Sequence, residues 1–303
     1  MSILAIIAAL ILEQWRPVGD RKAFLALLMQ WIEWLEHSFH SDAPRHGTIA
    51  WLLAVLPVSA VAFALHVLLY AASPLLALLF NVGVLYLTLG FRQFSHSFTA
   101  IQIAIKEGDL ERARALIGAW RGEEPLPRSR EEVIRLSIEQ ALLASHRHVF
   151  GVLFWYMLLP GPSGAILFRM AASLRSRWRP LGVFGEFAGK AFHALEWPAV
   201  RLTATAFALV GDFEDAVYCW RTQARSWLDE NDGIVLAAGA GAMGVRLGMS
   251  LQTASGAEEV RAELGVGESA DGPLLDRTVG LLWRALVVWV FVLLLVSMAL
   301  LVG

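Results

Sequence analysis

The chain has 303 residues, of which 57% are hydrophobic and only 17% charged, and its formal net charge is −2 at pH 7. Soluble domains carry about 25% charged residues, so this composition indicates that part of the surface faces lipid. The near-neutral charge gives no basic field for nucleic acid, and the single cysteine, Cys219, excludes an internal disulfide framework and a cysteine-based metal cluster.

Long apolar runs predict membrane-spanning helices in the first third and at the end of the chain. Residues 49–69 carry no formal charge, and at roughly 1.5 Å per residue they are long enough to cross a bilayer. Residues 75–89 follow after a minimal break at Pro74, which predicts a tight transmembrane hairpin. Residues 281–302 form the clearest span. The first twelve residues are apolar but short, and we expect no signal peptide there because no basic segment precedes them.

Two further apolar runs are weaker candidates for spans. Residues 149–170 are long enough but are interrupted by Pro160-Gly161-Pro162, which predicts a kinked or re-entrant helix. Residues 195–210 are short and contain Arg201. We therefore predict an all-α, polytopic helical membrane protein with four or five transmembrane helices and a cytoplasmic helical hairpin.

The polar blocks between the runs set the expected topology. Residues 92–148 hold the most lysine and arginine, so the positive-inside rule places them in the cytoplasm. The hairpin before them returns to the side it left, so residues 13–48 are expected there too. We expect a single membrane domain over residues 1–303, with 92–148 as a cytoplasmic helical insertion, 211–280 as a polar loop region and 281–302 as a C-terminal transmembrane anchor.

The cytoplasmic insertion should hold three helices. The first buries apolar residues at helical spacing, and the segment 106–109 breaks it and caps the second. The third begins near Ser129, with acidic residues in its first turn, and runs directly into the apolar run at Val149. The expected buried stripes are Phe94, Phe98, Ile101 and Ile105 in the first helix and Leu110, Ala113, Leu116 and Ile117 in the second.

Serine and histidine occur together in "SHRH", which contains His146 and His148. Adjacent helical residues do not face each other, so a serine–histidine nucleophile is not indicated. The histidines are also two residues apart, whereas a shared metal on a helix favours a spacing of four. We therefore expect no catalytic residue and no metal site, and we interpret both histidines as interfacial residues that remain candidates for ligand binding.

The segment "GIVLAAGAGAMGVRLG" contains a formal G-x-G-x-x-G at Gly239, Gly241 and Gly244. A dinucleotide site would need a βαβ unit around it and an acidic residue about twenty positions later. Nothing nearby indicates alternating strands. Small residues at this density favour the other reading, close contact between helices.

Arg201 lies inside an apolar segment, where an unpaired arginine costs about 2.5 kcal/mol or more. The acidic residues that could pair with it are Glu196 and Glu139. Two interpretations stay open: a contact to an anionic ligand, and an internal ion pair that fixes the helix bundle.

Four segments, in this order, resemble the CobD/CbiB–AmpE superfamily of bacterial inner-membrane proteins. They are "GDLERARALIGAWRG" (108–122), "VLFWYMLLPGPSGAILFRM" (152–170), "LEWPAVRLTATAFALVGDFEDAVYCWR" (195–221) and "AGAGAMGVRLG" (238–248). The resemblance covers most of the chain and implies a multi-pass protein of the bacterial inner membrane.

The CobD/CbiB branch of the superfamily contains cobalamin-pathway synthases that join an amino-alcohol arm to the corrin side chain with ATP. Their helix at 108–122 typically ends in Gly-Arg-Asp/Asn-Thr, whereas this chain has Trp120-Arg121-Gly122. Glu139 is retained, but Ser145 to His148 stand where Asn and Asp are typical. An ATP-dependent condensation needs carboxylates for Mg²⁺ and for orienting phosphates, so these losses argue against that reaction.

The AmpE branch shows the same losses, and its members are regarded as signalling proteins linked to β-lactamase induction and cell-wall sensing. We therefore expect an AmpE-like, non-catalytic regulator without a cofactor, in contact with the bilayer, a signalling protein partner and further copies of itself. The alternative is a CobD/CbiB-type, ATP-dependent amide-forming enzyme, adenosylcobinamide-phosphate synthase-like, with an altered active site; "GAMGVRLG" favours it. A structural membrane subunit has no motif behind it. The candidate ligand-binding or ion-pair residues are Arg201, Glu139, Glu196, His146, His148 and Arg246.

Overall fold

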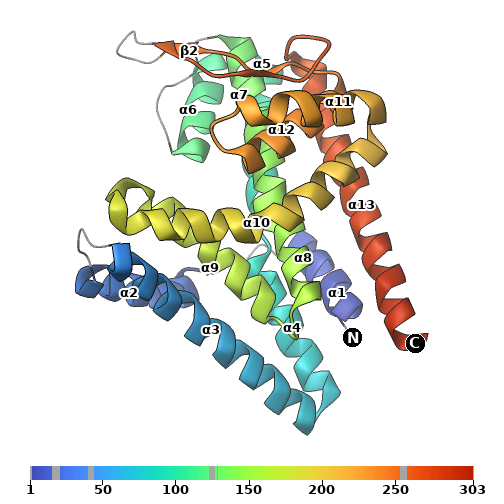
Figure 1. Ribbon diagram of the computed structural model, residues 1–303. Helices are drawn as coiled ribbons and strands as arrows, with labels where there is room; N and C mark the ends of the chain where they lie inside the picture. The colour runs from blue at the N-terminus through green and yellow to red at the C-terminus, as the bar shows by residue number, and fades with distance from the viewer. Residues whose placement is uncertain are drawn as a thin grey trace. The chain divides into compact units, whose positions relative to one another are not determined.

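A computed structural model describes residues 2–15, 21–39, 44–122, 127, 129–252 and 258–302. The described residues are mostly helical, which confirms the all-α prediction apart from four short strands. They fall into two compact units, and Figure 1 labels the helices and strands along the chain. The first unit contains Met1–Gly90, Arg147–Ala199 and Leu293–Gly303, and the second contains Phe91–His146 and Val200–Val292.

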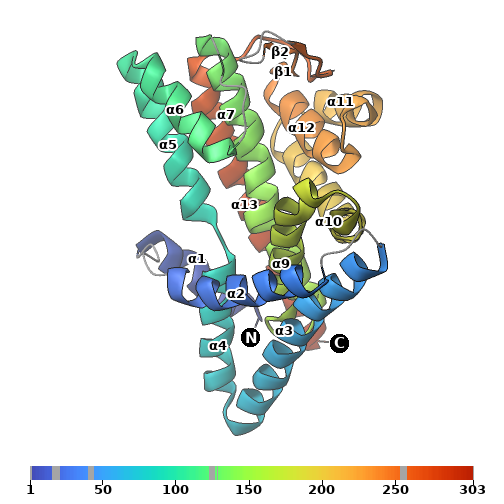
Figure 2. The ribbon, with the colours of Figure 1, turned by 90° about the vertical axis from the view of Figure 1, so that its left-hand side faces the viewer.

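In the first unit, helices pack both against their neighbours in the sequence and against helices far from them in the chain. Ser73 alone separates α3 from α4, which confirms the predicted tight hairpin; Figure 2 shows the two helices meeting at this turn. Arg177 on α9 binds Glu36 on α2 at 2.8 Å. The helices are α1 (Ser2–Trp15), α2 (Arg21–Phe39), α3 (Pro44–Ala72), α4 (Pro74–Thr88), α8 (Gly151–Leu158), α9 (Ser163–Trp178) and the first part of α10 (Val183–Val210).

The apolar run at 149–170 is not one continuous span. Helix α8 ends at Leu158, and α9 begins at Ser163 and packs against it. The turn between them follows from its residues: two prolines lack a backbone N–H, and Gly161 adopts φ +64°. A Cβ at Gly161 would also overlap the His66 ring on α3. The run is therefore a pair of helices, a sharper interruption than a kink.

The second unit confirms the three helices predicted for residues 92–148. Phe94, Phe98 and Ile101 are buried along α5. The Asp109 side chain caps α6 by accepting from the backbone N–H of Arg112, and Ser129 forms a capping box with Glu132 on α7. The helices are α5 (Phe91–Glu107), α6 (Leu110–Arg121) and α7 (Arg130–Ser145), which continues as the π-helix η1 (His146–Phe150) into α8.

Helix α12 (Glu230–Met243) shows why the chain concentrates glycine at 239–244. The helix is almost wholly buried. Gly239 lies against Leu142 on α7, and Gly241 lies against the backbone of Asp215 on α11 (Phe213–Gln223). Both glycines sit inside a helix, not in a strand-to-helix turn, so the reading of close helix contact is confirmed.

The segment expected to be a polar loop region, 211–280, is structured over its described residues. It contains α11, α12, the short 3₁₀ helix η3 (Ala224–Ser226) and two antiparallel strand pairs. Strand β1 (Leu247–Gly248) pairs with β4 (Glu263–Leu264), and β2 (Leu251–Gln252) pairs with β3 (Glu258–Glu259). These strands were not predicted, because two residues are too few to show an alternating pattern.

Among the described residues, two helices are long and apolar enough to cross a membrane, fewer than the four or five predicted. They are Arg45–Ala72 in α3 and Gly272–Ala299 in α13 (Gly272–Val302). Helices Ile3–Trp15 and Pro74–Thr88 are apolar but shorter. Residues 195–210 are the second part of α10, a helix that also carries Glu186 and Lys190, so they do not form a separate apolar helix.

Candidate functional site

Glu139 is a buried carboxylate at the centre of the second unit's polar interior. It lies on α7 and is 5% exposed. One carboxylate oxygen accepts a hydrogen bond from the backbone N–H of Gly248 at 2.9 Å, and the other forms an ion pair with the Arg261 guanidinium. Two residues more than 100 positions after Glu139 in the sequence therefore meet at this side chain.

Arg261 is held on two sides. Its guanidinium is paired with Glu139 and lies over the Trp227 ring, 4.7 Å from the ring centroid. Its side chain is 10% exposed, so both the ion pair and the cation–π contact are shielded from water. Arg261 comes from the segment between β3 and β4, and Trp227 follows η3.

Arg135 adds a second buried guanidinium. It lies four residues before Glu139 on α7, on the same helix face, and is 4% exposed. Its Nη1 contacts the Met249 sulfur at 3.2 Å. Among the described residues, its Nε and Nη2 have no hydrogen-bond partner, and neither does Nη1 of Arg261. We call Arg135, Glu139, Trp227, Met249 and Arg261 the arginine cluster.

The backbone turn after β1 brings Gly248 and Met249 into the arginine cluster. Gly248 has φ +78° and Met249 has φ +65°, a region that glycine adopts freely and methionine rarely. A Cβ at Gly248 would overlap the carbonyl oxygen of Ala262. Glycine is therefore required at position 248, and its N–H is aimed at Glu139.

Arg246 lies nearer the surface and has partners of its own. Its guanidinium donates to the Ser269 hydroxyl at 3.0 Å and lies 3.6 Å from Glu263. Its side chain is 39% exposed. The structure does not pair Arg246 with Glu139.

A second carboxylate, Glu196, lies buried in the first unit and is surrounded by cations. Arg147 approaches it to 3.2 Å and Arg175 to 3.7 Å. His148, also in the first unit, has its Nδ1 2.9 Å from Nη1 of Arg169. Glu196 and His148 thus belong to a network that joins η1, α9 and α10.

His146 and Arg201 lie in the second unit. His146 is buried, with its Nδ1 2.9 Å from the Thr203 hydroxyl on α10. Arg201 is half-buried. Its backbone carbonyl accepts a hydrogen bond from the Thr205 hydroxyl, one helical turn later. Of the two acidic residues considered for Arg201, Glu139 is engaged by Gly248 and Arg261 instead. His146 and His148 contact different partners.

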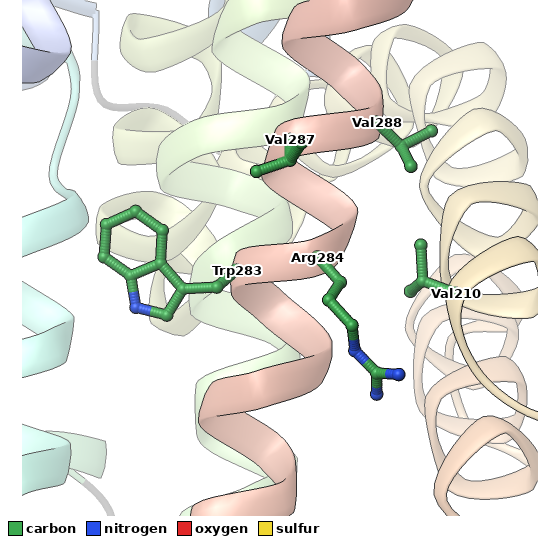
Figure 3. A pocket seen from close by; sticks show the side chains of 5 residues that line it. All are labelled: Val210, Trp283, Arg284, Val287 and Val288. Carbon is green, nitrogen blue, oxygen red and sulfur yellow. The ribbon is translucent and has the colours of Figure 1, made fainter.

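A pocket of about 410 Å³ lies on the second unit between α10 and α13. Figure 3 shows Trp283 and Arg284 leaving opposite sides of α13. Arg284 donates to the Gly280 carbonyl in its own helix at 3.2 Å. The lining contains no acid or hydroxyl group that could act on a substrate; it consists of Val210, Trp283, Arg284, Val287 and Val288. This pocket is therefore a weaker candidate site than the arginine cluster.

Comparison with known proteins decides the family. The family model described as "CobD/Cbib protein" matches residues 6–282. The chain belongs to the CobD/CbiB family. It is 33% identical to the "Cobalamin biosynthesis protein CobD" of Stutzerimonas stutzeri over 97% of this chain and 98% of the relative. It is 34% identical to the protein of the same name in Chromobacterium violaceum, over 85% of this chain and 81% of that relative. No solved structure matches the chain.

These relatives overturn the expected AmpE-like signalling role. CobD-named proteins match this CobD/CbiB chain along nearly its whole length, whereas the AmpE reading depended on losses in two short segments. A few substituted residues can alter a site, but they do not change the family to which a chain belongs. The segment "GAMGVRLG" was the more informative signal, because it supplies Gly248 to Glu139.

Sequence reasoning about this CobD/CbiB chain identified Glu139 and missed the rest of the arginine cluster. Arg135 offered a signal: a positive residue four positions from Glu139 in a helix whose other residues are mostly apolar. Arg261 and Trp227 offered none, because they lie in irregular segments and reach Glu139 only through the tertiary fold.

Proposed function

We propose that this chain is an enzyme of cobalamin biosynthesis of the CobD/CbiB type. In this reaction class, ATP activates a carboxylate of the corrin side chain and an amino alcohol then forms an amide with it. The whole-chain similarity to proteins named for cobalamin biosynthesis supports the pathway. The synthase chemistry follows from the resemblance to that branch of the superfamily.

One observation in the structure carries the proposal. Glu139 and the "GVRLG" segment are the two features that resemble the synthase branch, and they lie 109 residues apart in the sequence. The structure joins them through the hydrogen bond from Gly248 to Glu139. The two features that resemble the synthase branch are thus assembled at one buried position.

The proposed active site is altered relative to the synthase pattern. Trp120-Arg121-Gly122 replaces the Gly-Arg-Asp-Thr ending, and Ser145 to His148 replace the Asn and Asp positions. The α6 helix ends at Gly122, which takes φ +66° and closes the helix through its N–H to Gly118. Gly122 thus serves as a helix stop, and we expect the substrate carboxylates and phosphates to be handled by residues elsewhere in the second unit.

We also propose that the chain is a multi-pass protein of the bacterial inner membrane. The apolar length of α3 and α13 supports two crossings, and the α3–α4 hairpin supports a return to the starting side. The basic block 92–148 supports a cytoplasmic position for α5, α6 and α7.

Genetic complementation tests the proposed function. The chain is expressed in a bacterial strain that lacks its own CobD-type synthase, and corrinoid production is measured. We expect production to be restored. Feeding the amide product directly should rescue the strain with or without the chain, which locates the block at this step. If the chain accumulates in the membrane at the level of a working synthase and restores nothing, the proposal fails.

A further inference from the structure

The arginine cluster holds more positive than negative charge in a buried position. Arg135 is 4% exposed, and the side chains of Arg261 and Glu139 are 10% and 7% exposed. The Glu139 carboxylate is paired with Arg261, whereas Arg135 contacts the Met249 sulfur. The formal charge of the three side chains is +1.

The unmade hydrogen bonds lie on the same two arginines. A guanidinium has five N–H donors and no acceptor. Arg135 leaves Nε and Nη2 without a partner, and Arg261 leaves Nη1 without one. A buried cation without a partner is strongly destabilising, so arginines that served folding alone would be expected to have all their donors paired.

Glu139 and Trp227 contact the Arg261 guanidinium but leave one of its nitrogens, Nη1, without a hydrogen-bond acceptor among the described residues. The carboxylate takes one edge of the guanidinium and the indole ring covers its face, which fixes the plane of the group and leaves Nη1 as an oriented donor. Arg135 contacts only the Met249 sulfur, a weak acceptor. Within the part of the chain that the structure describes, the Nε and Nη2 donors of Arg135 and the Nη1 donor of Arg261 are thus left without an acceptor.

We propose that the arginine cluster is a binding site for an anionic oxygen group, a carboxylate or a phosphate, on a small ligand. Arginine suits both groups because its planar fork makes paired hydrogen bonds to two oxygens. Arg135 supplies the charge that Glu139 does not balance, and Arg261 supplies an oriented donor. The site does not depend on which reaction the chain catalyses.

The test measures thermal unfolding of the purified full-length chain in detergent. Sodium phosphate, ATP without metal and sodium succinate are compared with sodium chloride at matched ionic strength. We expect phosphate and ATP, or succinate, to raise the unfolding midpoint by several degrees in a saturable way, since a ligand that binds the folded state stabilises it. The arm that responds identifies the anion as phosphate or carboxylate. A midpoint equal to that in chloride in every arm overturns the proposal.

Arg135→Met separates ligand binding from a structural role. Methionine is similar in length and carries no charge, so without anion the midpoint should stay the same or rise, because no uncompensated cation remains. The rise caused by the anion should be lost. The matched control is Arg225→Met, at an arginine whose side chain is 87% exposed, and it should keep the full anion effect. An Arg135→Met protein that retains the wild-type anion effect contradicts the site.

Arg135→Lys provides a second variant if the methionine protein fails to fold. Lysine keeps the charge and loses the planar fork, so the folded protein should need several-fold more anion for the same rise in midpoint. An unchanged anion requirement in Arg135→Lys would contradict the role assigned to Arg135.

Discussion

Glu139 differs from the other acidic side chains of the second unit because its ion pair is buried. Its side chain and that of Arg261 are 7% and 10% exposed. By comparison, Glu111 is 82% exposed in its pair with Arg114. Exposed pairs contribute little to stability, whereas removing one partner of a buried pair leaves the other charge without compensation.

Glu139→Gln should therefore destabilise the protein strongly. Glutamine can still accept the Gly248 hydrogen bond, so the loss isolates the negative charge opposite Arg261. We expect the free energy of unfolding to fall by about 3–5 kcal/mol, measured by denaturant titration in detergent. The control Glu111→Gln should change it by less than about 1 kcal/mol. Equal effects of the two substitutions would show that the Glu139 pair is not stabilising.

Cys219 on α11 should be unreactive in the folded protein. Burial, with a smaller contribution from Asp215, raises the pKa of its thiol to about 11. At pH 8 such a thiol has about one-hundredth of the thiolate of an unperturbed one, so iodoacetamide should modify it only after unfolding. Because the folded state disfavours the thiolate, this group costs stability as the pH rises from 9 through about 11. Rapid alkylation of the folded chain at pH 8 would contradict this.

Among the helices and strands, the sequence predicted those features that depend on residues close together in the chain, such as helix starts and breaks. Asp109 and Ser129 were readable as helix starts because each caps its own helix within three residues. The Pro160–Pro162 interruption was readable as a break. Its full reversal into two packed helices was not, because that depends on the fit of Gly161 against His66. The strands from 247 to 264 were missed for the same reason: their pairing is tertiary.

Gly241→Ala tests the close contact between α11 and α12. A Cβ at this position would overlap the Asp215 backbone, so the helices must move apart, at a cost of about 1–3 kcal/mol in unfolding free energy. The matched control is Gly189→Ala on α10, where a Cβ meets nothing within 4 Å. That change should stabilise the protein by about 0.5–1 kcal/mol, since alanine favours helix. Thermal unfolding of both variants provides the comparison, and a neutral Gly241→Ala would show that the contact tolerates side chains.

For the whole molecule, the sequence predicted a helical membrane protein with four or five spans, and the described residues contain two helices long and apolar enough to cross a membrane. Apolar composition alone does not distinguish a span from a packed helix, and residues 195–210 illustrate this. They lie in the long helix α10, whose buried Glu196 is paired with Arg147 on η1 and Arg175 on α9. The candidate site was predicted only in its single acidic residue, because the arginines that complete it come together through the fold.

Thiol labelling in intact cells tests the proposed topology. Ala72→Cys lies at the exposed end of α3, beside the hairpin turn, and Glu107→Cys lies at the exposed end of α5. We expect a membrane-impermeant maleimide to label Ala72→Cys, and Glu107→Cys only after the cells are opened, since 92–148 is proposed to be cytoplasmic. The buried Cys219 should give little background. Labelling of Glu107→Cys in intact cells would show the opposite orientation, with residues 92–148 outside the cytoplasm.

The central claim is that this CobD/CbiB chain makes an amide in cobalamin biosynthesis. The most direct measurement is ADP release by the purified, folded protein supplied with Mg²⁺, ATP, a corrinoid carboxylate and an amino alcohol. We predict ADP release that requires both organic substrates and is matched by an equal amount of amide product. A folded protein that releases no ADP and forms no amide when all of these components are present would contradict it.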